Sequence, residues 1–166
     1  MTAHFNNNMF RPLARTKQEL SEKECQDILI KGKRGVLSLV GDEGYPYGVP
    51  LNHYYDPMEG KLYFHSGKSG HKIDAMKKEK KASFCVIDKG HQEKNEWFLR
   101  FNSVIVFGKI EFIEDEEVII DKSRELTRKF TDDDEYFQHE LETSLKNTAM
   151  FALNIEHLCG KRIKEE

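Results

Sequence analysis

The sequence predicts a mainly β protein, a small antiparallel β-barrel with α-helices at its ends. Short apolar segments follow one another with turn signals between them, which is typical of hairpins. A much longer apolar segment, residues 98–115, predicts one long strand. Strands and helices do not alternate regularly, so a doubly wound fold is not expected. The 166 residues fit one domain, which we expect over residues 14–166 after a flexible lead-in over residues 1–13.

The composition indicates a protein with a real core. Its hydrophobic fraction is 38% and its aromatic fraction 11%. The formal net charge of −3 does not favour nucleic acid as a partner. No apolar run is long enough to cross a bilayer, and the polar N-terminal segment lacks the apolar centre of a secretory signal. We therefore expect neither a membrane nor a nucleic-acid partner.

The three cysteines, Cys25, Cys85 and Cys159, are odd in number and widely spaced. This pattern argues against a disulfide framework. It also lacks the close pairs of a zinc site, so no metal is expected. We interpret them as reduced thiols of a cytoplasmic protein.

The first predicted helix begins at a capping box, in which Ser21 is followed three residues later by Glu24. The residues Cys25, Ile28 and Leu29 then share one helical face. Gly32 is a natural end for this helix. A strand is predicted directly after it, over residues 34–40.

A hairpin and a third strand are expected next. The turn at residues 41–44 leads into an extended segment, residues 45–56, that contains Pro46 and Pro50. Proline cannot donate a ladder hydrogen bond, so this strand belongs at an edge or a bulge. A second turn at residues 56–60 precedes the strand over residues 61–66.

The rest of the chain predicts three further strands, one of them the long segment over residues 98–115, and three helices. Gly108 lies within the long segment and predicts a bulge or bend there. Ile73 and Met76 form an apolar edge among lysines and favour a short helix. The remaining predicted elements are a helix from about residue 70, strands over residues 82–88 and 148–163, and helices over residues 116–130 and 134–145.

The loop after the third predicted strand combines small residues, hydroxyls and cations. Backbone amides, serine hydroxyls and lysine ammonium groups are the donors that a phosphate needs. Ser66, Lys68, Ser69 and Lys72 supply them near the start of a helix. The spacing is not that of a Walker loop or a dinucleotide fingerprint. On spacing alone, a solvated turn before an exposed basic helix is the simpler interpretation.

Three ordered motifs carry a resemblance to a known family. They are G-Y-P-x-x-V-P-L-N at residues 44–52, L-Y-F-H-S-x-x-x-G-x-K at residues 62–72 and S-V-x-x-x-G at residues 103–108. Together they resemble the flavin-binding split-barrel family related to pyridoxamine 5′-phosphate oxidase. The branch grouped with nitroimidazole-resistance proteins is the most similar. The resemblance covers roughly residues 14–156.

The resemblance implies a homodimer of six-stranded antiparallel split barrels, with one FMN in each of two clefts at the subunit interface. Carried over by position, the resemblance implies that the isoalloxazine ring contacts Val49, Pro50, Leu51 and Asn52, and that His65 and Ser66 lie beside the ring or the ribityl chain. The phosphate would be held by Ser69, Gly70, His71 and Lys72. The pocket would be completed by Ser103 and Val104, which either the same chain or the partner subunit would supply. Trp97 and Arg100 are looser candidates. No catalytic residue is assigned, because hydride transfer to a flavin needs no protein acid or base.

The resemblance favours an FMN-dependent oxidoreductase that reduces small electron-poor organic molecules, with NAD(P)H or another reductant as the electron donor. One alternative is a flavin- or haem-binding protein without turnover, for which His53, His65 and His71 are candidate haem ligands. Another is an enzyme like pyridoxamine 5′-phosphate oxidase itself. The arginine- and histidine-containing substrate motif of that enzyme is not found near residues 156–166. A third alternative is an empty barrel that serves as an interaction module.

Overall fold

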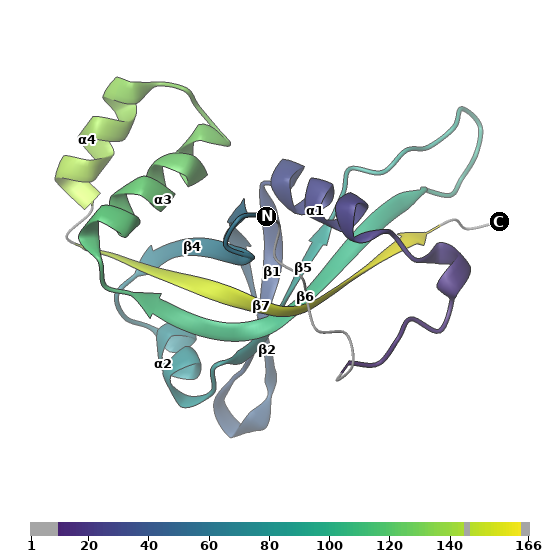
Figure 1. The fold of residues 1–166 in the computed structure, drawn as a ribbon, viewed down its shortest axis with the longest axis horizontal. Coiled ribbons are helices and arrows are strands. Elements are labelled where there is room, and N and C mark those ends of the chain that lie inside the picture. The colour runs from purple at the N-terminus through teal and green to yellow at the C-terminus, as the bar shows by residue number, and fades with distance from the viewer. Residues whose placement is uncertain (1–9, 145–146, 164–166) are drawn as a thin grey trace.

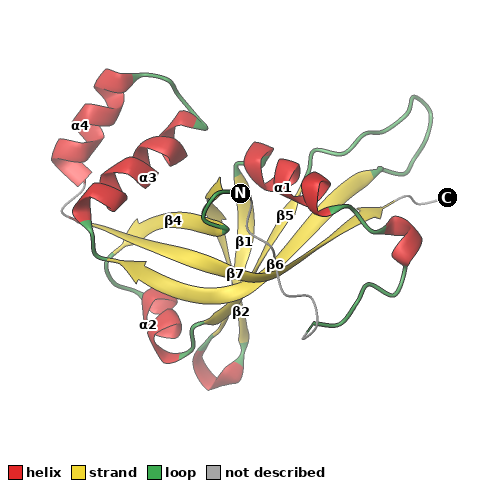
Figure 2. Ribbon diagram, in the orientation of Figure 1, coloured by secondary structure: helices red, strands yellow, loops and turns green. Residues whose placement is uncertain are grey.

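The computed structural model describes residues 10–144 and 147–163, and its centre is one antiparallel sheet that curls on itself (Figures 1 and 2). The strands are β1 (Arg34–Val40), β2 (Pro46–Asn52), β3 (Tyr54–Asp56), β4 (Lys61–Gly67), β5 (Lys81–Ile87), β6 (Phe101–Ile113) and β7 (Thr148–Ile163). Their order in the sheet is β2-β1-β5-β6-β7-β4-β3. Because β2 at one edge also approaches β4 near the other edge, the sheet forms a half-open barrel.

Four α-helices of the described residues flank this barrel (Figure 1). They are α1 (Glu22–Lys31), α2 (His71–Lys78), α3 (Glu116–Arg128) and α4 (Asp134–Ser144). The helix α1 packs on β7 and β3, and α2 follows β4 directly. The helices α3 and α4 follow one another in the chain, after the long strand β6 and before the long strand β7, and pack as a pair. The mainly β barrel with helices at its ends is thus confirmed.

The start of α1 is the predicted capping box. The amide of Ser21 donates to the Glu24 carboxylate at 2.8 Å, and the Glu24 amide donates to the Ser21 hydroxyl at 3.3 Å. Cys25 and Leu29 are buried on the predicted face, and the helix ends at Gly32. A local sequence signal therefore determines where this helix begins.

The sheet has seven strands rather than six, because the proline-containing segment divides at His53. Its first part, β2, is an edge strand, as Pro46 and Pro50 predicted. Its second part, β3, pairs with β4 and not with β1. Between them the His53 side chain is fully buried, with Nε2 at 2.9 Å from the Leu29 carbonyl oxygen. This buried contact ends one strand and starts the other.

The core lies on the inner face of the curled sheet. Phe64 is its centre and contacts Phe84 and Phe151, with ring centroids 5.0 and 5.1 Å away. The register of β6 against β7 shifts between Phe107 and Gly108, which confirms the predicted bulge. A Cβ atom at Gly108 would lie 2.1 Å from the Asn154 carbonyl oxygen, so only glycine fits there.

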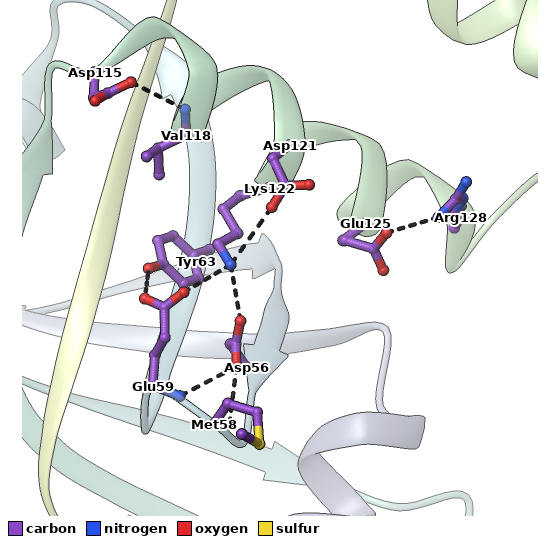
Figure 3. Close-up of polar contacts among 10 residues, drawn as sticks. All are labelled: Asp56, Met58, Glu59, Tyr63, Asp115, Val118, Asp121, Lys122, Glu125 and Arg128. Atoms are coloured by element: carbon purple, nitrogen blue, oxygen red, sulfur yellow. Dashed lines mark hydrogen bonds and ion pairs between the residues drawn. The ribbon is translucent and has the colours of Figure 1, made fainter.

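A cluster of ion pairs fixes α3 to the β3–β4 hairpin (Figure 3). The Lys122 ammonium group lies 2.8 Å from both the Asp56 and Glu59 carboxylates. The Tyr63 hydroxyl donates to Glu59. Burial alone would lower the pKa of Lys122, but the hydrogen bonds to Asp56 and Glu59 raise it well above its ordinary value. Lys122 is therefore held charged in the folded protein.

Parts of two predicted segments fall outside the described residues. The predicted lead-in over residues 1–13 lies largely outside them, and its end stays a prediction. Residue 145, the predicted end of α4, also lies outside them. None of the helices within residues 10–144 and 147–163 has the length and apolar composition needed to span a bilayer.

Candidate functional site

The turn between β4 and α2 leaves polar backbone groups open to a ligand. Gly70 precedes α2 with φ of 113°, a conformation that favours glycine, and no side chain caps the helix. The first amides of a helix cannot bond within it. The amides of Ile73 and Asp74 bond to the Gly70 carbonyl oxygen, whereas those of His71 and Lys72 find no acceptor in the described part of the chain. Two donors thus point out of the helix start, where a negative charge is stabilised.

The cations of this turn have no internal partner. Neither Lys68 nor Lys72 forms an ion pair with another described residue. Ser69 is exposed beside them, whereas the Ser66 hydroxyl donates to the Gly67 carbonyl oxygen at 2.8 Å. Lys68, Ser69 and Lys72 therefore supply free donors, and Ser66 is already satisfied within the chain.

The start of α2 lies against the start of β2. The Tyr47 and His71 rings stack with centroids 4.1 Å apart. The carboxylate of Asp42 lies 3.5 Å from the His71 ring and 3.0 Å from Lys78. The hydrogen bond from Lys78, with the charges of Lys78 and His71, lowers the pKa of Asp42. These contacts bring the phosphate-type donors next to the edge strand.

The predicted ring-binding residues follow along β2. Pro50 is exposed, Val49 is half-buried and Leu51 packs against the core. The side-chain oxygen of Asn52 accepts a hydrogen bond from Arg34 Nε at 2.8 Å. Because β2 is an edge strand, one row of its backbone donors and acceptors has no neighbouring strand. A flat polar ring can bond to that row.

The structure separates two predicted residues from the rest. Ser103 and Val104 lie on β6, three places from β2 in the sheet order. The Val104 side chain is fully buried in the core, while Ser103 is half-buried and pairs with Ile87 and Lys161. His65, by contrast, is exposed at the end of β4 near the α2 turn. Within one chain, the start of α2 contacts β2 through His71 and Tyr47, whereas the β6 residues lie elsewhere in the sheet.

Sequence reasoning missed Tyr47 as the residue that stacks on His71. The alternation of side chains along a strand could have identified it, because Tyr47 lies two positions before Val49 and so faces the same side. The looser candidate Trp97 is 83% exposed and contacts the Phe98 ring, over which the other looser candidate, Arg100, also lies. Trp97 therefore does not belong to the core of the described chain.

His53 is a core residue. It is fully buried, with its ring edge against Phe84 at a centroid distance of 5.0 Å. Burial lowers the pKa of His53 to about 3, with the nearby Lys129 charge adding to the effect. Among the described residues, no group of three or more histidine, cysteine or acidic side chains is arranged to hold a metal ion. A haem could not reach His53 without unpacking the core.

The fold and this site define a class, that of the antiparallel split barrels. The sequence pattern of the pyridoxamine 5′-phosphate oxidase family matches residues 21–162, which is most of the chain. The protein therefore belongs to the pyridoxamine 5′-phosphate oxidase family. A search of the curated proteins finds no match.

Solved structures share the fold at low sequence identity. A candidate 5-nitroimidazole antibiotic resistance protein from Bacteroides thetaiotaomicron superposes with a TM-score of 0.72 at 23% identity, over 87% of this chain and 86% of that one. An FAD-binding protein from Mesorhizobium loti superposes with a TM-score of 0.62 at 24% identity, over 89% of this chain and 98% of that one. A conserved hypothetical protein from Mycobacterium tuberculosis superposes with a TM-score of 0.76 at 15% identity, over 93% of this chain and 96% of that one.

Proposed function

We propose that this protein binds FMN and uses it to reduce small electron-poor organic molecules. The observation that carries the proposal is the uncapped start of α2, with unpaired Lys72, lying against the edge strand β2. Family membership supports the same site. A bound flavin supplies the hydride acceptor and donor, and the protein supplies binding and orientation.

The residues at the start of α2 fit a phosphate group. The amides of His71 and Lys72 point away from the helix, and the Lys72 ammonium adds a full positive charge. Charge-assisted hydrogen bonds of this kind are stronger than neutral ones. A Cβ atom added to Gly67 or Gly70 would meet nothing within 4 Å, so the surface beside these donors is open. A terminal phosphate dianion, as in FMN, suits this set of donors.

The β2 edge fits the flat part of the cofactor. Val49 and Leu51 offer apolar contact, and the unpaired backbone groups of the strand offer hydrogen bonds to the ring. Arg34 holds the Asn52 side chain, so its orientation is fixed before a ligand arrives. These groups bind and orient the ring without a titrating side chain.

A second copy of the chain is proposed to complete the site. An outward-facing row crosses five strands through the register partners Pro50, Val36, Cys85, Ile105 and Cys159. Val36 is 40% and Ile105 38% exposed. A contiguous exposed apolar surface of this kind marks an interaction site.

The position of the row links the interface to the cofactor. Pro50 at one end of the row is a predicted ring residue. Ser103 faces the same side as Ile105, two positions away on β6. A partner packed on this row would therefore bring its own Ser103 toward a flavin site, which would account for its distance from β2 within one chain.

The purified full chain tests this proposal. We expect yellow protein, or protein that turns yellow on FMN addition, with a flavin released on heating that mass spectrometry identifies as FMN. Anaerobic NADH or NADPH should bleach it, and a nitroaromatic should restore the colour. Retention of FAD instead would correct the cofactor, and flavin binding without bleaching by either donor would support a binding protein without turnover. Colourless protein that does not bind added FMN would contradict the proposal.

A further inference from the structure

A cavity of about 960 Å³ lies between α1, the start of β1 and the end of β5, away from the α2 turn. This volume is within the range of small-molecule sites. Its apolar lining comes from Leu20, Ile28, Val86, Ile87 and Phe130. The cavity can therefore bury a flat apolar body of one or two rings.

The carboxylates around this cavity already have partners. The Asp27 carboxylate pairs with Lys23 at 2.6 Å. Asp88 accepts hydrogen bonds from the backbone and side-chain nitrogens of Asn102 at 2.9 and 2.8 Å. Glu24 likewise bonds to Arg162 at 2.6 Å. The charges of Asp27 and Glu24 are thus compensated by cations, whereas Asp88 is hydrogen-bonded by a neutral amide and keeps its negative charge.

Four cations line the same cavity, against one carboxylate, Asp88, that has no cation partner in the described chain, and the Lys31 charge also acts on Asp27. Lys31, Lys33, Arg34 and Lys89 line it, and none forms an ion pair with a carboxylate of the described residues. The Lys33 ammonium lies over the Phe130 ring, 5.1 Å from its centroid. Arg34 uses Nε on Asn52, and its two terminal amino groups have no hydrogen-bond partner in the described chain. The surplus of unpaired charge favours an anion.

The carboxyl end of α1 also borders the cavity, and its exposed carbonyl groups would repel an anion. The positive charge of Lys129 offsets the partial negative charge of these carbonyl groups. Its ammonium group donates to the Gly32 carbonyl oxygen, and to that of His53 at 2.9 Å. Burial and the neighbouring Lys33 charge lower the pKa of Lys129 to about 8, so it remains largely charged at neutral pH.

We propose that this cavity binds a small aromatic carboxylate, with its ring against Ile28 and Phe130 and its carboxylate between Lys33 and Arg34. The site borders two residues assigned to the flavin, because Arg34 bonds to Asn52 and Ile87 pairs with Ser103. It contains none of the α2 phosphate donors, so the proposal does not depend on flavin binding.

Calorimetric titration of the full chain with 2-naphthoate, and with neutral 2-naphthamide as the isosteric control, tests this site. We expect saturable binding of the carboxylate and at least about tenfold weaker binding of the amide. The double variant Lys31→Gln/Lys33→Gln should weaken naphthoate by about tenfold, while Lys77→Gln on α2 should not. No saturable binding, equal binding of the two probes, or an unchanged double variant would overturn the proposal.

A variant of the phosphate site separates this proposal from the proposed function. Lys72→Ala should bind 2-naphthoate as the wild type does, even as its affinity for FMN falls. Amide chemical shifts should move at Ile28 and Phe130 in both proteins. Shifts confined to the α2 turn would mean that the aromatic carboxylate occupies the flavin site, and would contradict a separate cavity.

Discussion

The two ends of β4 place a lysine in opposite situations. At the start of the strand, Lys122 of α3 contacts Asp56 and Glu59, and its side chain is only 11% exposed (Figure 3). At its end, Lys72 of α2 has no ion-pair partner among the described residues. Lys122 therefore stabilises the fold, whereas Lys72 is available for the proposed phosphate. Substitutions at the two ends test this division of roles.

The largest expected effect is on the paired lysine. Lys122→Met leaves the buried Asp56 carboxylate and the more exposed Glu59 carboxylate without their cation. We expect the free energy of unfolding to fall by about 3 kcal/mol, measured by urea denaturation. Lys72→Met is the matched control and should change it by less than about 0.5 kcal/mol. Equal losses in both variants would remove the distinction between the two ends.

The same contrast exists between the two faces of β6. Val104 is buried in the core, and its neighbour Ile105 is exposed on the outer face. Ile105→Glu should weaken the proposed dimer by about a hundredfold, because it places an unpaired charge in an apolar contact. Light scattering across a dilution series measures this, with Ile105→Val as the control. An unchanged dimer, or a wild type that is monomeric at every concentration, would show that this face is not the interface.

Local signals predicted much of this architecture. The capping box at Ser21, the edge position of the strand with Pro46 and Pro50, and the bulge at Gly108 each follow from one residue type and its backbone chemistry. The division at His53 could not be predicted in this way. It depends on a contact with the Leu29 carbonyl oxygen, 24 positions earlier in the chain.

The candidate site, unlike these elements of the fold, was predicted from a family resemblance and not from local residue patterns. Spacing alone favoured a solvated turn at residues 67–72, and only the resemblance assigned these residues to a phosphate. The structure adds that the α2 start has no cap and that His71 stacks on Tyr47. The separation of Ser103 from β2 could not be read from the sequence, because it depends on strand order.

An intermediate effect is expected at the unpaired lysine. Lys72→Ala should weaken FMN binding by about tenfold or more, because a charge-assisted hydrogen bond to the phosphate is lost. Quenching of flavin fluorescence measures the dissociation constant. Lys77→Ala, on the same helix but in its last turn, is the control. Unchanged affinity in Lys72→Ala would count against the phosphate assignment.

The smallest effect concerns pH and the buried His53. Its folded-state pKa of about 3 lies below the ordinary value of 6.5, so the unfolded chain binds more protons between these values. Stability from this group is therefore present above pH 6.5 and is lost as pH falls toward 3. We expect His53 alone to cost about 1 kcal/mol of unfolding free energy between pH 7 and pH 5.5. In urea denaturation at several pH values, His53→Gln should reduce the dependence of the unfolding free energy on pH, and the control His139→Gln should not. Equal pH dependence in the two variants would contradict a buried, neutral His53.

We propose that the free donors at the start of α2 hold a phosphate. Parallel titrations of the wild-type chain with FMN and with riboflavin, which lacks the phosphate, test it most directly. We expect FMN to bind at least about tenfold more tightly than riboflavin, and Lys72→Ala to reduce this preference. Equal affinities for the two flavins, in wild type and variant alike, would contradict it.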